Sequence, residues 1–169
     1  MYESNSYMDT GGLGEPISVS THRMEEGRPL GEFYGLKSVG VSENGLFLIE
    51  KPDGEVVEFS TAYLTNDEYR QYLGNGLPKV YLGWGNTFTY KNWDLSMQFK
   101  GAFGHKIYNA TSMTLNNMSN FPTYNILSGA QHLNNGKGIH DVQISDYWLE
   151  KGDYMNFEYA SLGYTFTKD

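Results

Sequence analysis

The chain has 169 residues, of which 15% are aromatic and 20 are glycine, and its formal net charge of −8 includes only 12 lysines and arginines. This balance excludes the basic surface that nucleic-acid binding requires, so we expect no nucleic-acid partner. The sequence contains no cysteine, which excludes disulfides, thiolate catalysis and thiolate metal sites.

The first part of the chain predicts one strand and a turn after an irregular start. Residues 1–30 are rich in glycine, serine and glutamate and show no hydrophobic period. Residues 33–41 predict a strand, which ends in a turn at 42–45 with the sequence Ser-Glu-Asn-Gly. The longest apolar run, 46–49, is far shorter than the ~20 residues that a membrane-spanning helix needs.

A small polar hairpin is predicted at 45–60. Its turn lies at 52–54, where Pro-Asp-Gly combines a fixed φ with a glycine that accepts the left-handed conformation. Beyond it, residues 65–71 predict one helical turn, with Thr65 or Asn66 as its N-cap.

Residues 80–103 predict a long β-hairpin with two different faces. Apolar residues occupy the even positions of its first strand and the odd positions of its second strand. A two-residue turn at 91–92 produces this change of parity if Tyr90 pairs with Trp93. A slip of one residue would mix the two faces, so the register is well specified.

This pattern is typical of two strands in the wall of a membrane β-barrel, with one face toward lipid and the other toward a wet lumen. The strands reach the ~9–11 residues that a tilted strand needs to cross a bilayer, and aromatic residues gather at the turn. The residues predicted to face lipid are Val80, Leu82, Trp84, Phe88, Tyr90, Trp93, Leu95, Met97, Phe99 and Phe103. The residues predicted to face the lumen are Thr87, Thr89, Asp94, Ser96, Gln98 and Lys100. The alternative is a long hairpin of a soluble sandwich, whose apolar face would point inward.

The last part of the chain predicts a long loop and one more strand. Residues 109–146 are rich in asparagine, serine and glycine, which favours irregular structure. A strand is predicted at about 154–166, and its apolar positions change parity halfway. A β-bulge near Glu158 and Tyr159 would bring these apolar residues onto one face.

Three ordered stretches of the chain carry recognisable motifs. Residues 31–37 read GEFYGLK, residues 72–109 contain WGNTF and YKNWDL, and residues 146–154 with 162–166 read DYWLEKGDY and LGYTF. In the same order, these stretches resemble segments of the SusC/RagA-like TonB-dependent outer-membrane transporters, among them the G-x-F-Y-G-Y-K strand and the W-L-E-D-G-S-Y and L-G-Y-T segments. The chain departs mildly from the family pattern at Gly76, His105 and Lys151.

This resemblance implies an all-β fold, an antiparallel meander that forms an open, curved part of a transmembrane β-barrel. It implies long extracellular loops at about 42–71 and 109–146. Family members are several times longer, so residues 1–169 are expected to be a piece near the C-terminal end of the barrel. The plug domain and the terminal strands are expected to lie outside this piece, and Met1 is expected to be internal to the full protein. The implied location is the outer membrane of a Gram-negative bacterium, with membrane lipid, a SusD-like surface lipoprotein and TonB as partners.

The implied function is import of a nutrient, either an oligosaccharide or a peptide. The alternative function is that of a soluble β-rich carbohydrate-binding or adhesin module. The loop at 109–146 offers hydrogen-bonding and stacking groups without fixed charge, which suit a neutral glycan or the face of a lipoprotein, and the sequence leaves both open. These candidate residues are Asn116, Asn117, Tyr124, Gln131, His132, Asn134 and Asn135.

Chemistry of other kinds finds no support in the sequence. The 4 histidines lack metal-ligand spacing, and no G-x-S-x-G, Walker or dinucleotide-binding motif occurs. We therefore expect neither an enzyme nor a bound cofactor or metal.

Overall fold

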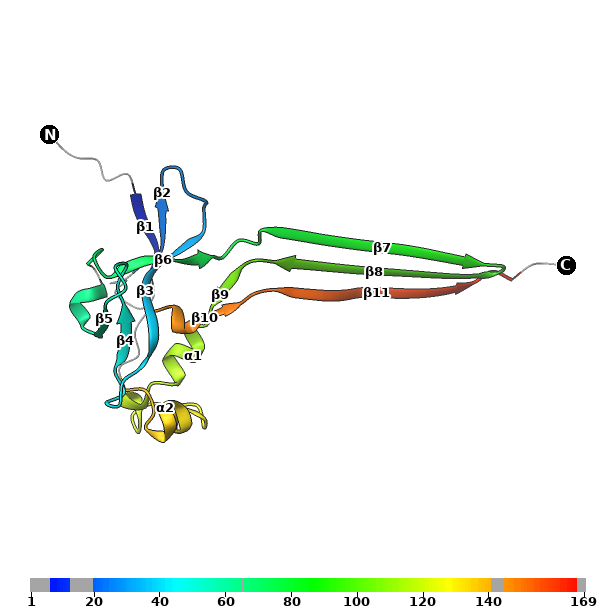
Figure 1. Ribbon diagram of the computed structural model, residues 1–169. Helices are drawn as coiled ribbons and strands as arrows, with labels where there is room; N and C mark the ends of the chain where they lie inside the picture. Colours follow the sequence, from blue (N-terminus) through cyan, green and yellow to red (C-terminus); the bar gives the residue numbers. More distant parts are fainter. Residues whose placement is uncertain (1–6, 13–19, 65, 141–144, 167–169) are drawn as a thin grey trace.

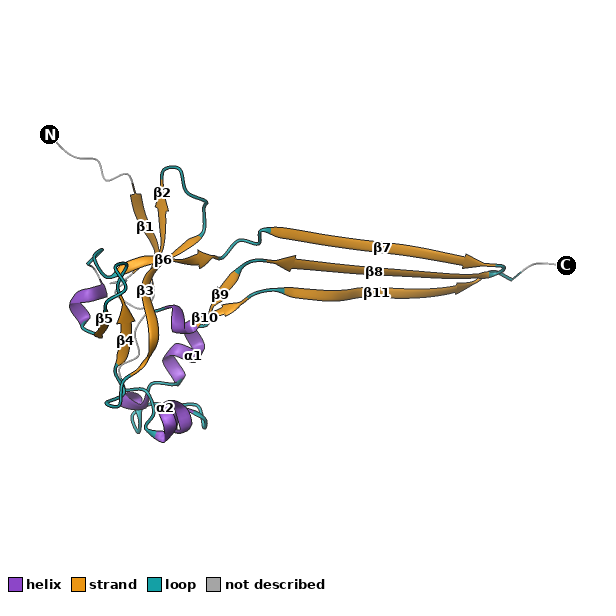
Figure 2. Ribbon diagram, in the orientation of Figure 1, coloured by secondary structure: helices purple, strands orange, loops and turns teal. Residues whose placement is uncertain are grey.

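The computed structural model describes residues 7–12, 20–64, 66–140 and 145–166. Figure 1 shows a compact body of short strands and helices, from which a long three-stranded sheet extends to one side. Figure 2 shows that the helices belong to the body. The strands pair antiparallel within each sheet, and the sheets are open, which confirms the predicted fold class.

The long sheet contains β7 (Val80–Tyr90), β8 (Trp93–Phe103) and β11 (Tyr154–Tyr164), with β8 in the centre. The predicted two-residue turn joins β7 to β8, and Lys91 in this turn has a φ of 53°. Tyr90 pairs with Trp93, and the pairing continues without a shift to Val80 and Phe103. The register predicted from the alternation is therefore confirmed along the whole hairpin.

A β-bulge lies in β11 at the predicted position. Phe157 pairs with Phe99 and Tyr159 pairs with Gln98, so Glu158 is the extra residue on the β11 side. An extra residue reverses the parity of everything after it. For this reason Met155 and Leu162 lie on the same face of the sheet although their positions differ in parity.

The sheet of the body contains six strands. They are β1 (Tyr7–Gly12), β2 (Ser20–Glu25), β3 (Glu32–Val41), β4 (Phe47–Glu50), β5 (Val56–Glu58) and β6 (Arg70–Asn75). The central strand β3 pairs with β6 over its first half and with β4 over its second half. The sequence predicted β3 but not β1 and β2, which are joined to β3 through the single pair of His22 with Phe33.

The hairpin of β4 and β5 matches the prediction for 45–60 in its turn but not in its polarity. The Lys51 N–H donates to the Glu55 carbonyl oxygen at 2.9 Å, and Gly54 within the turn has a φ of 89°. On β4, however, Phe47 and Ile49 have 0% of their surface exposed. They alternate with partly buried residues, so one face of this hairpin belongs to the core.

The core of the body is a single cluster of large apolar side chains. Its buried members are Leu36, Phe47, Ile49, Phe59, Ile139 and Trp148. They come from β3, from β4, from the segment after β5 and from two places in the last third of the chain. Burial of this cluster fixes segments that are far apart in the sequence.

The predicted helical turn at 65–71 is wrong, because the helical turn η1 lies earlier, at Thr61–Leu64. Asn66 instead accepts a hydrogen bond from the Glu68 N–H at 3.0 Å and forms a local turn, after which β6 begins. Thr65, the other predicted cap, lies outside the described residues.

Residues 109–140, which we call the helical segment, contain more regular structure than the predicted loop. Its elements are α1 (Ala110–Leu115), η2 (Met118–Asn120), η3 (Ala130–His132) and α2 (Leu133–Gly136). The short strands β9 (Lys106–Tyr108) and β10 (Leu149–Lys151) pair on either side of it, and η4 (Asp146–Trp148) precedes β10. No helix in the described part of the chain is long and apolar enough to cross a membrane.

Candidate functional site

One face of the long sheet is apolar across all three strands. The ring of Phe99 in the central strand lies 5.4 Å from the Trp84 ring and 4.8 Å from the Phe157 ring. Near the turn, Trp93 and Tyr164 lie 4.8 Å apart. The side chains of Trp84 and Phe157 are 46% and 54% exposed, so the described chain does not cover this face.

The register places the predicted hairpin residues on the same two faces of the sheet that the sequence predicts. Side chains of directly paired residues share a face. The predicted lipid-facing residues form the pairs Val80 with Phe103, Trp84 with Phe99, Phe88 with Leu95 and Tyr90 with Trp93, together with Leu82 and Met97. The predicted lumen-facing residues form the pairs Thr87 with Ser96 and Thr89 with Asp94, together with Gln98 and Lys100. Contact of the apolar face with lipid and contact of the polar face with a lumen both stay predictions.

The other face of the sheet is polar and carries cross-strand hydrogen bonds. The hydroxyl oxygens of Thr87 and Ser96 lie 3.0 Å apart. Lys100 forms an ion pair with Glu158 at 2.5 Å. The bulge therefore places the charge of Glu158 on the same face as Lys100, away from the apolar rings.

Three tyrosines on the polar face were missed by the sequence analysis. Tyr81 and Tyr154 both pair with Ala102, one from each side, and Tyr159 pairs with Gln98. Tyr81 is 73% exposed. The alternation that starts at Val80 already assigns Tyr81 to the polar face, so the signal was present in the sequence.

The long sheet is fixed to the body at the point where β8 and β11 meet β9 and β10. The Gly104 N–H donates to a carboxylate oxygen of Asp153 at 2.6 Å, and the Gly152 N–H donates to the His105 carbonyl oxygen at 2.9 Å. The Lys106 ammonium group donates to the Leu73 carbonyl oxygen of β6 at 2.7 Å. These bonds hold the end of the long sheet to β9, β10 and β6.

Three of the predicted loop residues hold the backbone of the helical segment. Asn116 is buried and donates to the Ser112 carbonyl oxygen at 2.9 Å. Asn117 accepts from the Ser119 N–H at 3.0 Å, which caps η2. Asn134 donates to the Ser42 carbonyl oxygen at 3.0 Å and joins the helical segment to the turn after β3.

The other four predicted loop residues are exposed. Gln131 and His132 contact each other at 3.2 Å, and Asn135 has a φ of 55°, a left-handed conformation that asparagine tolerates. Tyr124 is 68% exposed. The structure therefore does not bring the seven predicted residues together, and of these seven only Tyr124 lines the pocket described next.

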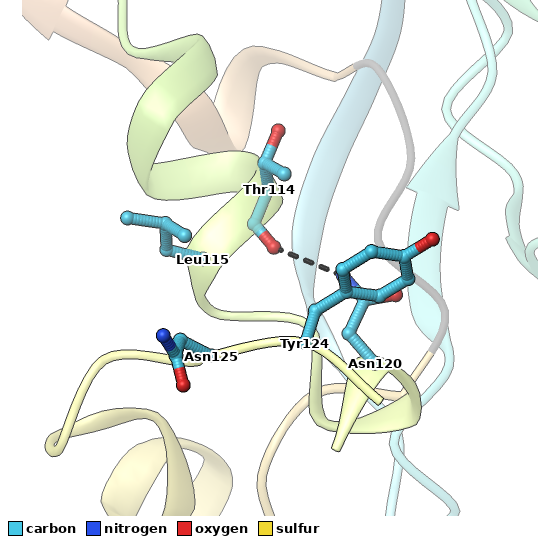
Figure 3. Close-up of a pocket in the computed structure, with 5 residues that line it drawn as sticks. All are labelled: Thr114, Leu115, Asn120, Tyr124 and Asn125. Carbon is cyan, nitrogen blue, oxygen red and sulfur yellow. Dashed lines mark hydrogen bonds between the residues drawn. The ribbon is translucent and has the colours of Figure 1, made fainter. Parts of the chain in front are cut away.

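A pocket of about 380 Å³ lies beside α1 and is shown in Figure 3. Its lining residues are Thr114, Leu115, Asn120, Tyr124 and Asn125. The Asn120 side chain donates to the Thr114 carbonyl oxygen at 3.3 Å, which joins the two walls of the pocket. None of the five lining residues carries a charge.

A second depression of about 350 Å³ adjoins the first along α1. Its lining residues are Ala110, Thr111, Thr114 and Leu115, so the two hollows share Thr114 and Leu115. Sequence reasoning missed Thr111, Thr114, Asn120 and Asn125. Their roles depend on how the chain folds back between η2 and η3, and no local pattern encodes this.

Two partly buried ionisable groups lie in the body. Burial raises the pKa of Tyr108, whose hydroxyl donates to the Met113 sulfur at 3.3 Å. Burial also raises the pKa of Asp146, which accepts a hydrogen bond from the Ser38 N–H at 2.6 Å. Within the described ranges, no three histidine or acidic side chains gather closely enough to hold a metal ion.

No protein-family model matches the sequence, and no curated protein matches it. Several solved structures resemble the fold. They include a structure of the RagAB peptide transporter, with a TM-score of 0.70, and the RagAB peptide importer in its closed-closed and open-open states, with TM-scores of 0.71 and 0.62. Sequence identity is 16% in each case, and the matches cover 97% of this chain but only 18 to 19% of the other chain. The chain thus spans about a fifth of the length of the transporter chains whose fold it shares in part.

Proposed function

We propose that this chain forms part of the wall of an outer-membrane β-barrel that imports a nutrient, and that it carries out no enzymatic reaction. The observation that carries the proposal is the long sheet, a single layer with one apolar face, one polar face and no covering layer in the described chain. The shared fold with part of the RagAB peptide transporter supports it.

The length of the strands fits this role. Each strand of the long sheet has 11 residues, which at ~3.4 Å per residue gives ~37 Å. A tilt of ~45° reduces the height to ~26 Å, close to the ~25 Å apolar band of an outer-membrane barrel. Strands of soluble sheets are usually about half as long.

The two outer strands need further neighbours. β7 and β11 each pair only with β8 among the described residues. Lipid cannot satisfy the free N–H and C=O groups of such an edge, so a membrane-spanning sheet must close into a barrel. We propose that strands outside this chain complete the closure, and that the body, with its helices and its own packed core, lies outside the membrane.

The proposed substrate is an oligosaccharide or a peptide, and the proposed partners are a SusD-like surface lipoprotein and TonB. Uptake needs binding and a gated path but no covalent chemistry. The rival proposal, a soluble carbohydrate-binding or adhesin module, is supported by the small core and pocket of the body. This rival proposal does not explain what covers the exposed aromatic rings of the long sheet.

Fractionation of cells that express the full-length protein tests the proposal. We expect the protein in the outer-membrane fraction after a carbonate wash, with faster gel migration before boiling than after boiling, as a closed barrel gives. A protein that is released by carbonate and is monodisperse without detergent would contradict the membrane role and favour the rival.

A further inference from the structure

We propose that the two adjoining hollows along α1 form a binding site for an uncharged oligosaccharide. This inference rests on the proposed import function for its biological role, but the binding itself does not depend on the barrel. Tyr124 and Asn125 line the first hollow, and the second hollow shares Thr114 and Leu115 with it.

The absence of charge in the lining selects a neutral ligand. The chain has 20 acidic and 12 basic side chains, yet none of them lines either hollow. The polar lining groups are hydroxyls and carboxamides, which donate and accept hydrogen bonds. Sugar hydroxyls also do both, so the two sets of groups are complementary.

The aromatic ring offers the second element of sugar recognition. Tyr124 is 68% exposed, and in Figure 3 its ring lies opposite Leu115 and Asn125 across the opening. A pyranose ring has one face covered by C–H groups, which can stack on the face of a phenol. An exposed ring beside hydroxyl and carboxamide groups is a suitable platform for this contact.

The backbone around the hollows disfavours an extended peptide as ligand. Such peptides usually add to a free strand edge. The walls here are helix and turn, whose N–H groups are used internally: Tyr124 donates to the Asn120 carbonyl oxygen and Leu127 to the Leu115 carbonyl oxygen, each at 2.8 Å. No lining side chain could pair with a charged peptide terminus.

The size of the site indicates more than one sugar unit. Ligand pockets usually have ~300–1,000 Å³, so each hollow alone is at the small end of that range. Because the hollows share Thr114 and Leu115, one ligand can occupy both. We therefore infer an oligomer with at least one unit in each hollow.

Calorimetric titration of the purified full-length protein tests the site. The probes are maltohexaose, cellohexaose, xylohexaose and laminarihexaose, beside hexagalacturonate as a charged sugar and a Gly-Ser hexapeptide. We expect at least one neutral hexasaccharide to bind. Tyr124→Ala should weaken that binding about 5- to 10-fold through loss of stacking, and Asn125→Ala about 3- to 10-fold through loss of a hydrogen bond.

Two variants serve as controls. Tyr124→Phe keeps the ring and should retain most of the affinity, and Phe121→Ala removes an exposed ring that does not line the hollow and should change nothing. The site is refuted if no neutral hexasaccharide binds, if Tyr124→Ala and Asn125→Ala leave binding unchanged, or if they weaken only the charged sugar or the peptide. A carbonate-soluble protein that binds through Tyr124 would refute the import proposal and leave this site intact.

Discussion

At the scale of single residues, Asp146 links the helical turn η4 to the central strand of the body. Its carboxylate accepts from the Ser38 N–H at 2.6 Å, where the register of β3 with β4 shifts. Ser145 beside it is fully buried and forms an isolated parallel β-bridge with Leu36 of β3. The last third of the chain is held to β3 through these contacts.

Two substitutions of Asp146 separate the contribution of its hydrogen-bond acceptor from the contribution of its negative charge. Asp146→Ala leaves the Ser38 N–H without its acceptor and should cost ~1–3 kcal/mol. Asp146→Asn keeps an acceptor and should cost much less. The measurement is the urea midpoint of the purified full-length protein, followed by tryptophan fluorescence. An asparagine variant as unstable as the alanine variant would contradict this assignment.

The pH dependence of the same variants follows from the pKa of Asp146, which burial raises. A raised pKa in the folded state means that folding favours the protonated form. The stability that this provides is fully present below the unfolded-state pKa and is lost as the pH rises through the folded-state pKa. Asp146→Asn cannot ionise, so the stability difference between acidic and neutral pH should be smaller than in the parent protein. An unchanged or larger difference would show that Asp146 does not contribute.

At the scale of elements, two glycines of the long sheet have opposite environments. A Cβ on Gly101 of β8 would lie 2.8 Å from the Tyr154 carbonyl oxygen, which is backbone, and 2.7 Å from the Phe103 ring. A Cβ on Gly83 of β7 would meet nothing within 4 Å. The two positions therefore form a matched pair.

Gly101→Ala should force β8 and β11 apart and destabilise the sheet by ~1–3 kcal/mol. Gly83→Ala should be neutral or slightly stabilising, since it restricts the unfolded chain. The urea midpoint of the folded protein measures both. Equal effects of the two substitutions would mean that β11 does not pair with β8 as described.

The elements also show which parts of the fold a sequence can predict. The hairpin of β7 and β8 was predicted to the residue because its period is strict over both strands and the turn at Lys91 changes the parity once. The bulge at Glu158 was predicted for the same reason. The helical segment has no such period: local capping by Asn109 and Asn117 and burial of Ile139 in the core order it, and that burial depends on tertiary contacts.

The sequence predicts only those parts of the candidate site that depend on a local pattern. The two faces of the hairpin follow from local alternation, whereas the lining of the hollows depends on contacts between distant turns. Asn116 and Asn134, two of the predicted ligand or partner residues, each donate a side-chain hydrogen bond to a backbone carbonyl oxygen, and their contact with a ligand or partner stays a prediction. Exposed Tyr124 is the predicted loop residue that lines a pocket.

At the scale of the whole molecule, the chain combines a small packed body with a sheet that has no core of its own. The body buries Leu36, Phe47, Ile49 and Trp148 together, as a globular domain does. The long sheet leaves its aromatic rings exposed over three strands. Water is a poor environment for such a surface, and lipid on one side with a wet lumen on the other would satisfy both faces.

The most direct test of the membrane role compares two adjacent positions of the central strand. Phe99, near the middle of β8, pairs with Trp84 and Phe157 on the apolar face, and Gln98 pairs with Gly85 and Tyr159 on the polar face. An arginine that faces lipid near the middle of a barrel costs roughly 2–4 kcal/mol, whereas one in the lumen costs little. We expect Phe99→Arg in the full-length protein to reduce strongly the amount of heat-modifiable, folded barrel in outer membranes, and Gln98→Arg to leave it near the parent level. Equal tolerance of both substitutions, or greater damage from Gln98→Arg, would contradict the proposal that this sheet spans a membrane.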